Sequence, residues 1–600
     1  MQKLILLLGL FLLLTACAET DPAVTADLTI KKWQKVSLDF AGPKSSETAA
    51  DNPFVNYRLD VTFRNGEREM TVPGFYAADG NAAESSADAG NVWRVHFRPD
   101  EVGEWTWEAT LHHGDQVVYD PQKGERIELE GGVGTLLVQP AAAGEKGRLV
   151  RNHPRYLTWA ETGQAFLKGG ADSPENLLGY YEFDGTYRHS NEFREGEAKT
   201  EGLHEFASHA GDFTDGPTWQ DGKGKNLMGA LSYLAGLGVN SFYALTLNIN
   251  GDGKDVWPFV DHETFDRFDV SKLAQWERLF DHADDLGMMI HLVLQETENE
   301  NLLDGGDTGP QRQLYFRELV ARFGHHPAVM WNLGEENGPN DWSDNYQTTA
   351  QQEAMIDWFA ANDPYQNYVV LHTHPGAEAF AKIYEPLLGN GNLGGLSMQL
   401  GNGYIAHEQT KLWIERSREA GAPWIITLDE VGPWYRGLDP DTGYTPHPEN
   451  NNQDSLRALT LWGNLMAGGA GVEWYFGAKN ENNDLNAEDW RSRERAWKWT
   501  AAAIQFFQQH VPFAEMENHD ELLTAGAYCL ANNDTYLVYL PFGQTTKLDL
   551  TQATGAFTLR WYAGETGAHA EGNDQPLTGG QMAVLTPPGD GDWAGLLTRN

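Results

Sequence analysis

The chain has 600 residues, 41% of them hydrophobic and 12% aromatic, which excludes a wholly disordered protein. Lys and Arg number 43 against 86 Asp and Glu, so the formal net charge is −43. The electric field of so large a negative charge repels polyanions, so no nucleic acid is expected as a partner. The length exceeds one ordinary domain and predicts a large central domain with smaller ones attached.

The first residues predict an export signal. Lys3 precedes a short apolar run, Leu4–Leu14, which is too short for a well-flanked membrane span. The ending Leu14-Thr15-Ala16-Cys17 resembles a bacterial lipoprotein signal, in which the cysteine is lipidated. We therefore expect a signal peptide at 1–17, lipid on Cys17, a tether at 18–30 and contact with the membrane through the lipid anchor only. Ala18 resembles the outer-membrane sorting pattern of Gram-negative lipoproteins, and an ordinary cleaved signal peptide is the alternative.

Residues 31–145 predict an antiparallel β-sandwich of immunoglobulin type. Trp93, Val95 and Phe97 alternate with polar residues, which is the period of a half-buried strand, and turn signals such as Asn65-Gly66 recur. The small, polar segment from Gly80 to Gly90 predicts a flexible loop.

Four short motifs in this part resemble an N-terminal module of unknown function that precedes glycoside-hydrolase-like barrels in bacterial proteins. The motifs are Asn52-Pro53-Phe54, Gly74-Phe75-Tyr76, Phe97-Arg98-Pro99-Asp100 and Gly103-Glu104-Trp105. The resemblance implies a β-sandwich that binds sugar or supports the next domain.

Residues 150–510 alternate between helical and strand patterns. One apolar helix face runs from Leu273 to Leu286, Gly287 marks the helix end, and a buried strand follows at Met288–Leu294. Strands that are apolar on both faces and separated by amphipathic helices indicate a parallel sheet. Eight predicted strands begin near Ala165, Val239, Met288, Ala328, Asn367, Gly395, Trp424 and Ala470. This number favours a (β/α)8 TIM barrel over a doubly wound sheet, since no Gly-x-Gly-x-x-Gly turn follows a strand.

Residues 513–600 return to a β pattern, with clean alternation at Thr535–Pro541 and Phe557–Tyr562. They resemble the C-terminal modules found behind such barrels, some of which are labelled collagen-binding. The predicted fold class is therefore multidomain α/β, with a central barrel between two β-sandwiches.

Two of the predicted barrel strands end in acidic residues. Trp331-Asn332-Leu333-Gly334-Glu335-Glu336 ends strand four, and Ile426-Thr427-Leu428-Asp429-Glu430-Val431-Gly432 ends strand seven. Two carboxylates at one barrel face suit glycoside hydrolysis, which needs an acid and a nucleophile or base. Both endings resemble those of the large retaining clan of barrel glycosidases. The resemblance implies that Glu336 is the acid/base and Glu430 the nucleophile. Glu335 stands where the clan has asparagine, so it either binds the sugar 2-hydroxyl or is itself the acid.

Other polar and aromatic residues follow the predicted strands and are expected to contact substrate. They are Asp172, Asn248, Asp252, Trp257, Glu335, Asn337, His372, His374, Gln399, Trp434, Glu473 and Trp474. For Trp434 and Trp474 the expectation is stacking on a sugar ring, with barrel packing as the alternative.

No metal or cofactor is predicted. His372 and His374 have a spacing that can bind a metal, but no third ligand stands at a fixed offset. His325-His326-Pro327, before strand four at the base of the barrel, is interpreted as structural. The chain also lacks the motifs of serine hydrolases, zincins and phosphate loops.

The pattern predicts an exported glycoside hydrolase that acts on a poly- or oligosaccharide. Non-catalytic glycan binding at the cell surface is the main alternative. Adhesion to collagen or matrix, based on the C-terminal module, is a third.

Overall fold

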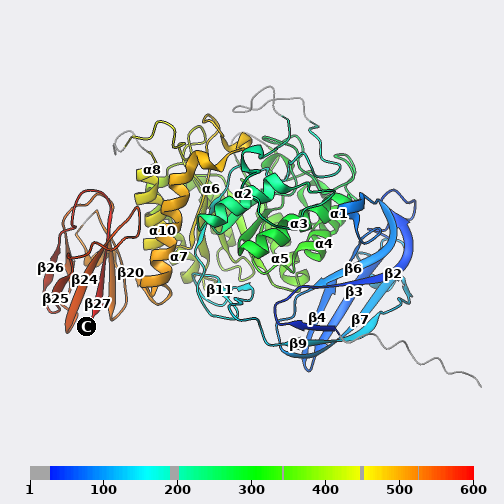
Figure 1. Cartoon of the computed structure of the whole chain (residues 1–600), viewed down its shortest axis with the longest axis horizontal. Helices are drawn as coiled ribbons and strands as arrows, with labels where there is room; N and C mark the ends of the chain where they lie inside the picture. The colour runs from blue at the N-terminus through cyan, green and yellow to red at the C-terminus, as the bar shows by residue number, and fades with distance from the viewer. Residues whose placement is uncertain (1–27, 190–201, 341–343, 446–451, 525) are drawn as a thin grey trace, which may run out of the picture.

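The computed structural model describes residues 28–189, 202–340, 344–445, 452–524 and 526–600. Predicted signal residues 1–17, including Cys17, and most of the predicted tether lie outside these ranges. The chain forms an elongated molecule with N-terminal sheets at one end, a barrel in the middle and C-terminal sheets at the other end (Figure 1). Within the described residues, no helix has the length and apolar character needed to cross a bilayer.

The N-terminal part consists of two sheets packed face to face. One has the strand order β1-β9-β7-β3-β4 with β8 beside β7, and the other the order β2-β6-β5. Their shared core contains Phe63 stacked on Phe97, with ring centroids 3.8 Å apart. The strands are β1 (Leu28–Lys31), β2 (Val36–Ser46), β3 (Tyr57–Asn65), β4 (Arg68–Pro73), β5 (Phe75–Tyr76), β6 (Ala89–Phe97), β7 (Gly103–His113), β8 (Glu125–Ile127) and β9 (Val133–Gln139). Residues 28–30, expected in the tether, thus belong to a strand.

The segment expected to be a flexible loop, Gly80 to Gly90, is ordered. It contains the short helix α1 (Ala82–Ser85), which lies on the barrel helix α3 (Val270–Leu286). The side chains of Ala82 and Ala83 are buried there. The prediction was wrong because small residues, which indicate a loop in isolation, also allow close packing between two domains.

The central part is a closed barrel of eight parallel strands, which confirms the predicted fold class. Every residue of these strands is buried, as expected for a barrel covered by helices. The strands are β12 (Lys168–Ala171), β13 (Ser241–Leu245), β14 (Met289–Val293), β15 (Val329–Asn332), β16 (Tyr368–Thr373), β17 (Gly395–Leu400), β18 (Ile425–Val431) and β19 (Gly471–Trp474).

The unit from α3 to β14 shows how the local sequence builds the barrel. Asp269 caps α3 by accepting a hydrogen bond from the backbone N–H of Lys272 at 2.9 Å. The face that includes Leu273 and Trp276 is buried against the barrel. Gly287, at φ 71°, ends the helix in a left-handed conformation and turns the chain into β14.

The longer helices pack around the barrel (Figure 1). Besides α3, they are α2 (Lys225–Gly236), α4 (Pro310–Phe323), α5 (Thr349–Asn362), α6 (Ala377–Ile383), α7 (Ala406–Glu419) and α10 (Glu494–His510). A shorter helical stretch near α7 includes α8 (Asn452–Ser455) and α9 (Trp462–Met466).

The C-terminal part packs against the α9 and α10 side of the barrel. Its larger sheet has the order β20-β21-β22-β27-β24-β25, and β23 pairs with β26 in a second sheet. Trp462 of the barrel stacks on Tyr539 with centroids 4.4 Å apart, so the two domains share an apolar contact. The strands are β20 (Glu517–Asn518), β21 (Tyr528–Ala531), β22 (Thr535–Leu540), β23 (Thr546–Asp549), β24 (Ala556–Ala563), β25 (Gln575–Thr578), β26 (Met582–Leu585) and β27 (Trp593–Arg599).

Candidate active site

Acidic side chains from several strand ends gather at the carboxyl edge of the barrel. One oxygen from each of Glu175, Glu296 and Glu335 lies within 4.8 Å of the other two, and all three side chains are buried. Asp172 and Asp484 extend this cluster. Burial and the charges of neighbouring carboxylates raise the pKa of each. Parallel strands of a barrel bring their carboxyl ends to one face, so residues far apart in sequence meet here.

Glu335 and Glu336 follow β15 and point to different partners. Glu335 is 4% exposed and lies in the carboxylate cluster. Glu336 accepts a hydrogen bond from Nε2 of Gln399 at 2.8 Å and has an oxygen 3.4 Å from Nδ1 of His374. Its backbone has φ 43°, a left-handed conformation that a glutamate adopts only when its surroundings hold it. This turn separates the directions of the two side chains.

The two glutamates also differ in proton affinity. Burial raises the pKa of Glu335 to about 7, and the neighbouring Glu430 carboxylate adds to the rise. Burial also disfavours the charged form of Glu336, but His374 and Gln399 outweigh it and hold the pKa below its usual value. Near neutral pH, Glu335 can therefore donate a proton while Glu336 stays a carboxylate.

Glu430 reaches the same edge through an irregularity in β18. Met398 pairs with Leu428 and Gln399 pairs with Glu430, so Asp429 is an extra residue in the ladder. The Glu430 carboxylate lies 3.4 Å from Nε2 of His372. Gln399, the register partner of Glu430, donates to Glu336, so the ends of β17 and β18 share contacts with the residues that follow β15.

A buried ion network fills the barrel below the site. Lys168 Nζ lies 2.5 Å from Asp429 and 3.2 Å from Glu473, and Glu473 is 2.7 Å from Nδ1 of His291. Burial opposes ionisation of Glu473, but Lys168 and His291 lower its pKa to about 2. Glu473 is fully buried in this network, so its expected role as a substrate contact is corrected to a structural one.

Three further predicted contacts are also internal. Asn248 is buried and bonds the backbone of its own loop at Asp252 and Gly251. Trp257 is 2% exposed, with Lys272 over its ring, and cannot stack on a sugar. Asn337 is fully buried and donates to Gln347 at 2.7 Å. These side chains shape the loops of the barrel face rather than line a surface for substrate.

The two candidate tryptophans differ in position. Trp474 is fully buried and donates from Nε1 to Thr500 of α10, so it packs on the outside of the barrel and the stacking role is wrong. Trp434 is 50% exposed at the rim. Its backbone carbonyl accepts a 2.7 Å hydrogen bond from Tyr475, a residue whose pKa burial and nearby carboxylates, including Glu430, raise. Trp434 is thus connected to the acidic site through Tyr475.

Several acidic residues of the site are not marked by any motif in the sequence. Glu175 and Glu296 lie just past β12 and β14, and Asp484 follows β19. An acid shortly after each barrel strand is a signal that could have found them. Tyr404 and Tyr435 are exposed, as Trp434 is, and Tyr435 lines a cavity of about 460 Å³ in the loop after β18.

The cluster of Glu175, Glu296 and Glu335 has the oxygen atoms that a hard cation requires. Within the described ranges, His372 and His374 belong to none of the groups of three or more His, Cys, Asp or Glu residues whose ligand atoms lie within 4.8 Å of one another. Each of these histidines instead faces a glutamate, Glu430 and Glu336 respectively.

Comparison with known proteins adds to this geometry. Residues 29–112 match a family model described as a domain of unknown function, DUF5060. No curated protein matches the chain. The chain is similar to the crystal structure of a candidate glycoside hydrolase from Bacteroides vulgatus, with a TM-score of 0.63 at 16% identity, covering 96% of this chain and 100% of that one.

A glycoside hydrolase family 5 structure from Bacteroides vulgatus gives a TM-score of 0.52 at 15% identity, over 76% of this chain and 93% of that one. Another structure, described as a glycoside hydrolase, gives 0.54 at 14% identity, over 76% and 97% of the two chains. At such identities the likeness establishes the fold, which is that of glycoside-hydrolase barrels.

Proposed function

We propose that this protein is an exported glycoside hydrolase that cleaves a poly- or oligosaccharide with retention of configuration. The observation that carries the proposal is the pair Glu335 and Glu430 at one barrel edge, the first with a pKa raised to about 7 by burial and by the second. The likeness to glycoside-hydrolase barrels supports the same reaction class.

In the proposed mechanism Glu335 protonates the leaving glycosidic oxygen while the Glu430 carboxylate attacks the anomeric carbon. The sugar–oxygen bond breaks and a glycosyl ester forms on Glu430. Glu335, now ionised, takes a proton from water, which hydrolyses the ester and restores both groups. This assignment selects Glu335, the alternative left open by the sequence, over Glu336.

Glu336 then has a different role. Its contacts with His374 and Gln399 keep it charged and oriented, so we propose that it accepts hydrogen bonds from sugar hydroxyls. Asp172, Glu175 and Asp484, whose pKa values burial raises, can be protonated and donate to hydroxyls as well. So many carboxyl groups favour a neutral or cationic sugar over an acidic one.

A panel of plant and algal polysaccharides, assayed for new reducing ends, tests this function. Wild type is expected to release reducing ends from at least one neutral polymer, and Glu430→Gln to lose that activity while still binding the polymer. Glu521→Gln, an exposed change in the C-terminal part, is the matched control. Unchanged activity in Glu430→Gln would reject the nucleophile.

Proton NMR of the first product anomer tests the stereochemistry. Retention is expected for a covalent intermediate, and an inverted anomer would contradict the role of Glu430. The alternative function, glycan binding without cleavage, predicts binding by wild type with no reducing ends from any polymer.

We also propose that Cys17 anchors the protein to the outer membrane. Labelled palmitate incorporation is expected in wild type and should disappear in Cys17→Ala. Incorporation that survives the change would refute the anchor.

A further inference from the structure

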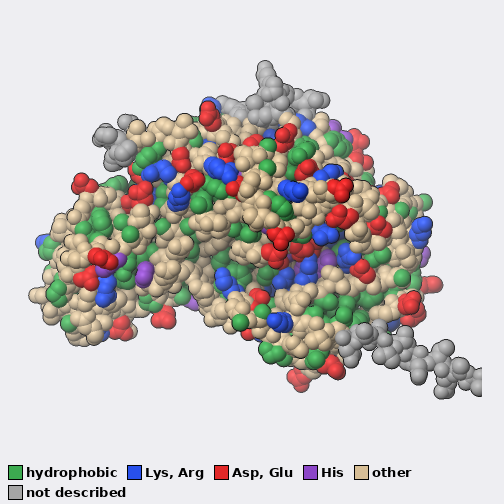
Figure 2. Space-filling model, viewed as in Figure 1, with side chains coloured by type: hydrophobic (Ala, Val, Ile, Leu, Met, Phe, Trp, Pro, Cys, Tyr) green, Lys and Arg blue, Asp and Glu red, His purple; other side chains and the backbone are tan. Residues whose placement is uncertain are grey.

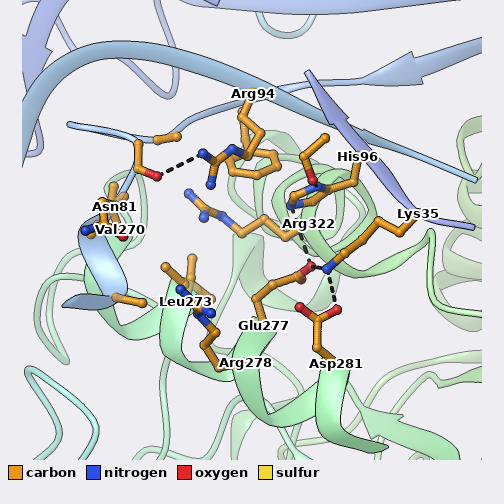
Figure 3. A pocket seen from close by; sticks show the side chains of 17 residues that line it. Lys35, Asn81, Arg94, His96, Val270, Leu273, Glu277, Arg278, Asp281 and Arg322 are labelled. Carbon is orange, nitrogen blue, oxygen red and sulfur yellow. Dashed lines mark hydrogen bonds and ion pairs between the residues drawn. The ribbon is translucent and has the colours of Figure 1, made fainter. Parts of the chain in front are cut away.

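A second cluster of ionisable residues lies at the base of the barrel, away from the acidic edge. It stands where the N-terminal sheets meet α3 and the loop before β15, beside a cavity of about 180 Å³ (Figure 3). Lys35 directly precedes β2, His96 lies in β6, and Glu277 and Asp281 lie on α3. His325 and His326 come from the His-His-Pro segment that the sequence analysis interpreted as structural.

The imidazoles converge on a single carboxylate. Nε2 of His325 and Nε2 of His96 lie 3.4 and 3.6 Å from Oε1 of Glu277, and Nε2 of His326 lies 3.5 Å from Oε2. One donor atom from each of Glu277, Asp281, His325 and His326 lies within 4.8 Å of the others. These separations are longer than ordinary hydrogen bonds, but the nitrogen and oxygen atoms are close enough to bind one ion between them.

Several of these atoms make no hydrogen bond. His325 is 1% exposed, and neither of its ring nitrogens has a hydrogen-bond partner. The same is true of Nε2 of His326 and Oε2 of Glu277. Buried polar atoms are normally satisfied, so unsatisfied atoms that face one another indicate a missing ligand.

The outer nitrogens of two histidines are already oriented. Nδ1 of His326 lies 2.9 Å from Asp284, and Nδ1 of His96 lies 2.8 Å from the hydroxyl of Ser37. A carboxylate or hydroxyl behind the ring is the usual support of a metal-binding histidine, because it fixes the tautomer with Nε2 free.

We propose that Glu277, His325 and His326 bind a divalent transition ion of the zinc type, with His96 or Asp281 as the fourth ligand. A tetrahedral zinc site with bonds of 2.0–2.1 Å has ligand–ligand separations of roughly 3.3 Å. The observed separations of 3.4–3.6 Å between the nitrogens and the Glu277 oxygens match that geometry. Nitrogen-rich sets of this kind favour zinc over magnesium or calcium.

Lys35 occupies one oxygen of Glu277 and leaves the other free to bind an ion. Its Nζ lies 2.9 Å from Oε1 of Glu277 and contacts Asp281, while Oε2 of Glu277 remains available. Nε2 of His326 faces this free oxygen, whereas His325 and His96 lie nearer to Oε1. With His96 as the fourth ligand, the ion would link the N-terminal sheets to the base of the barrel. Its role would be to hold the two domains together, independent of the proposed hydrolysis.

Metal binding is tested on the full-length protein purified without a histidine tag. After dialysis against zinc and then metal-free buffer, about one equivalent of zinc per chain is expected by elemental analysis. Cobalt should give the intense visible absorption of a tetrahedral site. Zinc should raise the midpoint of thermal unfolding by several degrees, since it binds only the folded protein. No retained metal and no shift in wild type would overturn the proposal.

Variants locate the site. Glu277→Gln and His325→Phe are expected to lose the zinc, the cobalt absorption and the thermal shift. His407→Gln is the control, because His407 is also buried between domains but has both nitrogens hydrogen-bonded, to Gly463 and Asp520. Zinc retained by His325→Phe would place the ion elsewhere and contradict the assignment. Should a variant fold poorly, the wild-type titration decides alone.

Discussion

Two adjacent glutamates, Glu335 and Glu336, have opposite electrostatic surroundings. Burial and the Glu430 carboxylate favour the neutral form of Glu335, whereas Glu336 contacts an imidazole and an amide, which favour its charged form. The left-handed turn at Glu336 makes this separation possible. The sequence alone does not show which of the two is the general acid. Their neighbours in the fold distinguish them.

A pH profile tests which glutamate is the acid. A general acid must carry its proton, so kcat/KM should fall as pH rises through about 7, the pKa of Glu335. Glu335→Gln should lower kcat about 10²–10⁴-fold and remove this alkaline limb. Glu336→Gln should mainly raise KM and leave the limb in place.

The matched pair of variants controls for the loss of one negative charge at the same strand end. An alkaline limb that persists in Glu335→Gln but disappears in Glu336→Gln would return the acid role to Glu336. Circular dichroism should show both variants folded, since neither change alters side-chain volume appreciably.

At the scale of elements, the barrel strands were predictable from sequence because their apolar runs are bounded by glycines and amphipathic helices. The start of β15, for example, falls at Val329, one residue from the predicted position. The extra residue in β18 was not predictable, because a bulge depends on the register of its neighbour. Buried Glu473 and Trp474 were misread for a related reason, since strand ends point both into and out of the barrel.

The remaining wrong or missed predictions concern residues in loops. Asn248 and Trp257 stand in a loop rich in turn residues, where sequence does not show which side chains fold inward. Glu175 and Glu296 were missed because no motif marks them, although each follows a strand. The sequence therefore predicts the acids at the ends of β15 and β18, but not the acids in the loops after β12 and β14.

The rim loop after β18 gives a prediction for substrate binding. Trp434 is half exposed and edge-to-face with Tyr435, with centroids 5.8 Å apart. With a stacking energy of about 0.5–1.5 kcal/mol, as for an aromatic pair, Trp434→Ala should raise KM about 2- to 12-fold with little change in kcat. Trp474→Phe should instead lower thermal stability and leave KM unchanged, because it loses its Thr500 contact. Equal KM in Trp434→Ala and wild type would remove Trp434 from the binding surface.

At the scale of the whole molecule, acidic side chains are spread over the visible face (Figure 2), in keeping with the net charge of −43. A large net charge of one sign keeps proteins apart in solution but weakens domain contacts through repulsion. The interfaces counter this with buried basic residues. Arg98 joins Asp284 at 2.8 Å on the N-terminal side, and Arg457 joins Asp592 at 2.7 Å on the C-terminal side. These pairings link distant residues, so sequence periodicity could not predict them.

The C-terminal interface yields a stability prediction. Asp592 accepts hydrogen bonds from Arg457 and from the hydroxyl of Tyr539 at 2.6 Å, and both charged side chains are less than a tenth exposed. Removing one partner of a buried pair costs up to about 3–5 kcal/mol, and Arg457 would keep only its second ion pair, with Asp454 at 2.6 Å. Asp592→Asn should therefore lower the midpoint of thermal unfolding by roughly 5–15 °C, while Asp590→Asn, an exposed change nearby, should not. Because the side-chain partners of Asp592, Arg457 and Tyr539, are not among the residues of the acidic edge, kcat at 25 °C should be unchanged. A variant as stable as wild type would mean that the apolar contact of Trp462 with Tyr539, rather than the ion pair, holds the C-terminal sheets to the barrel.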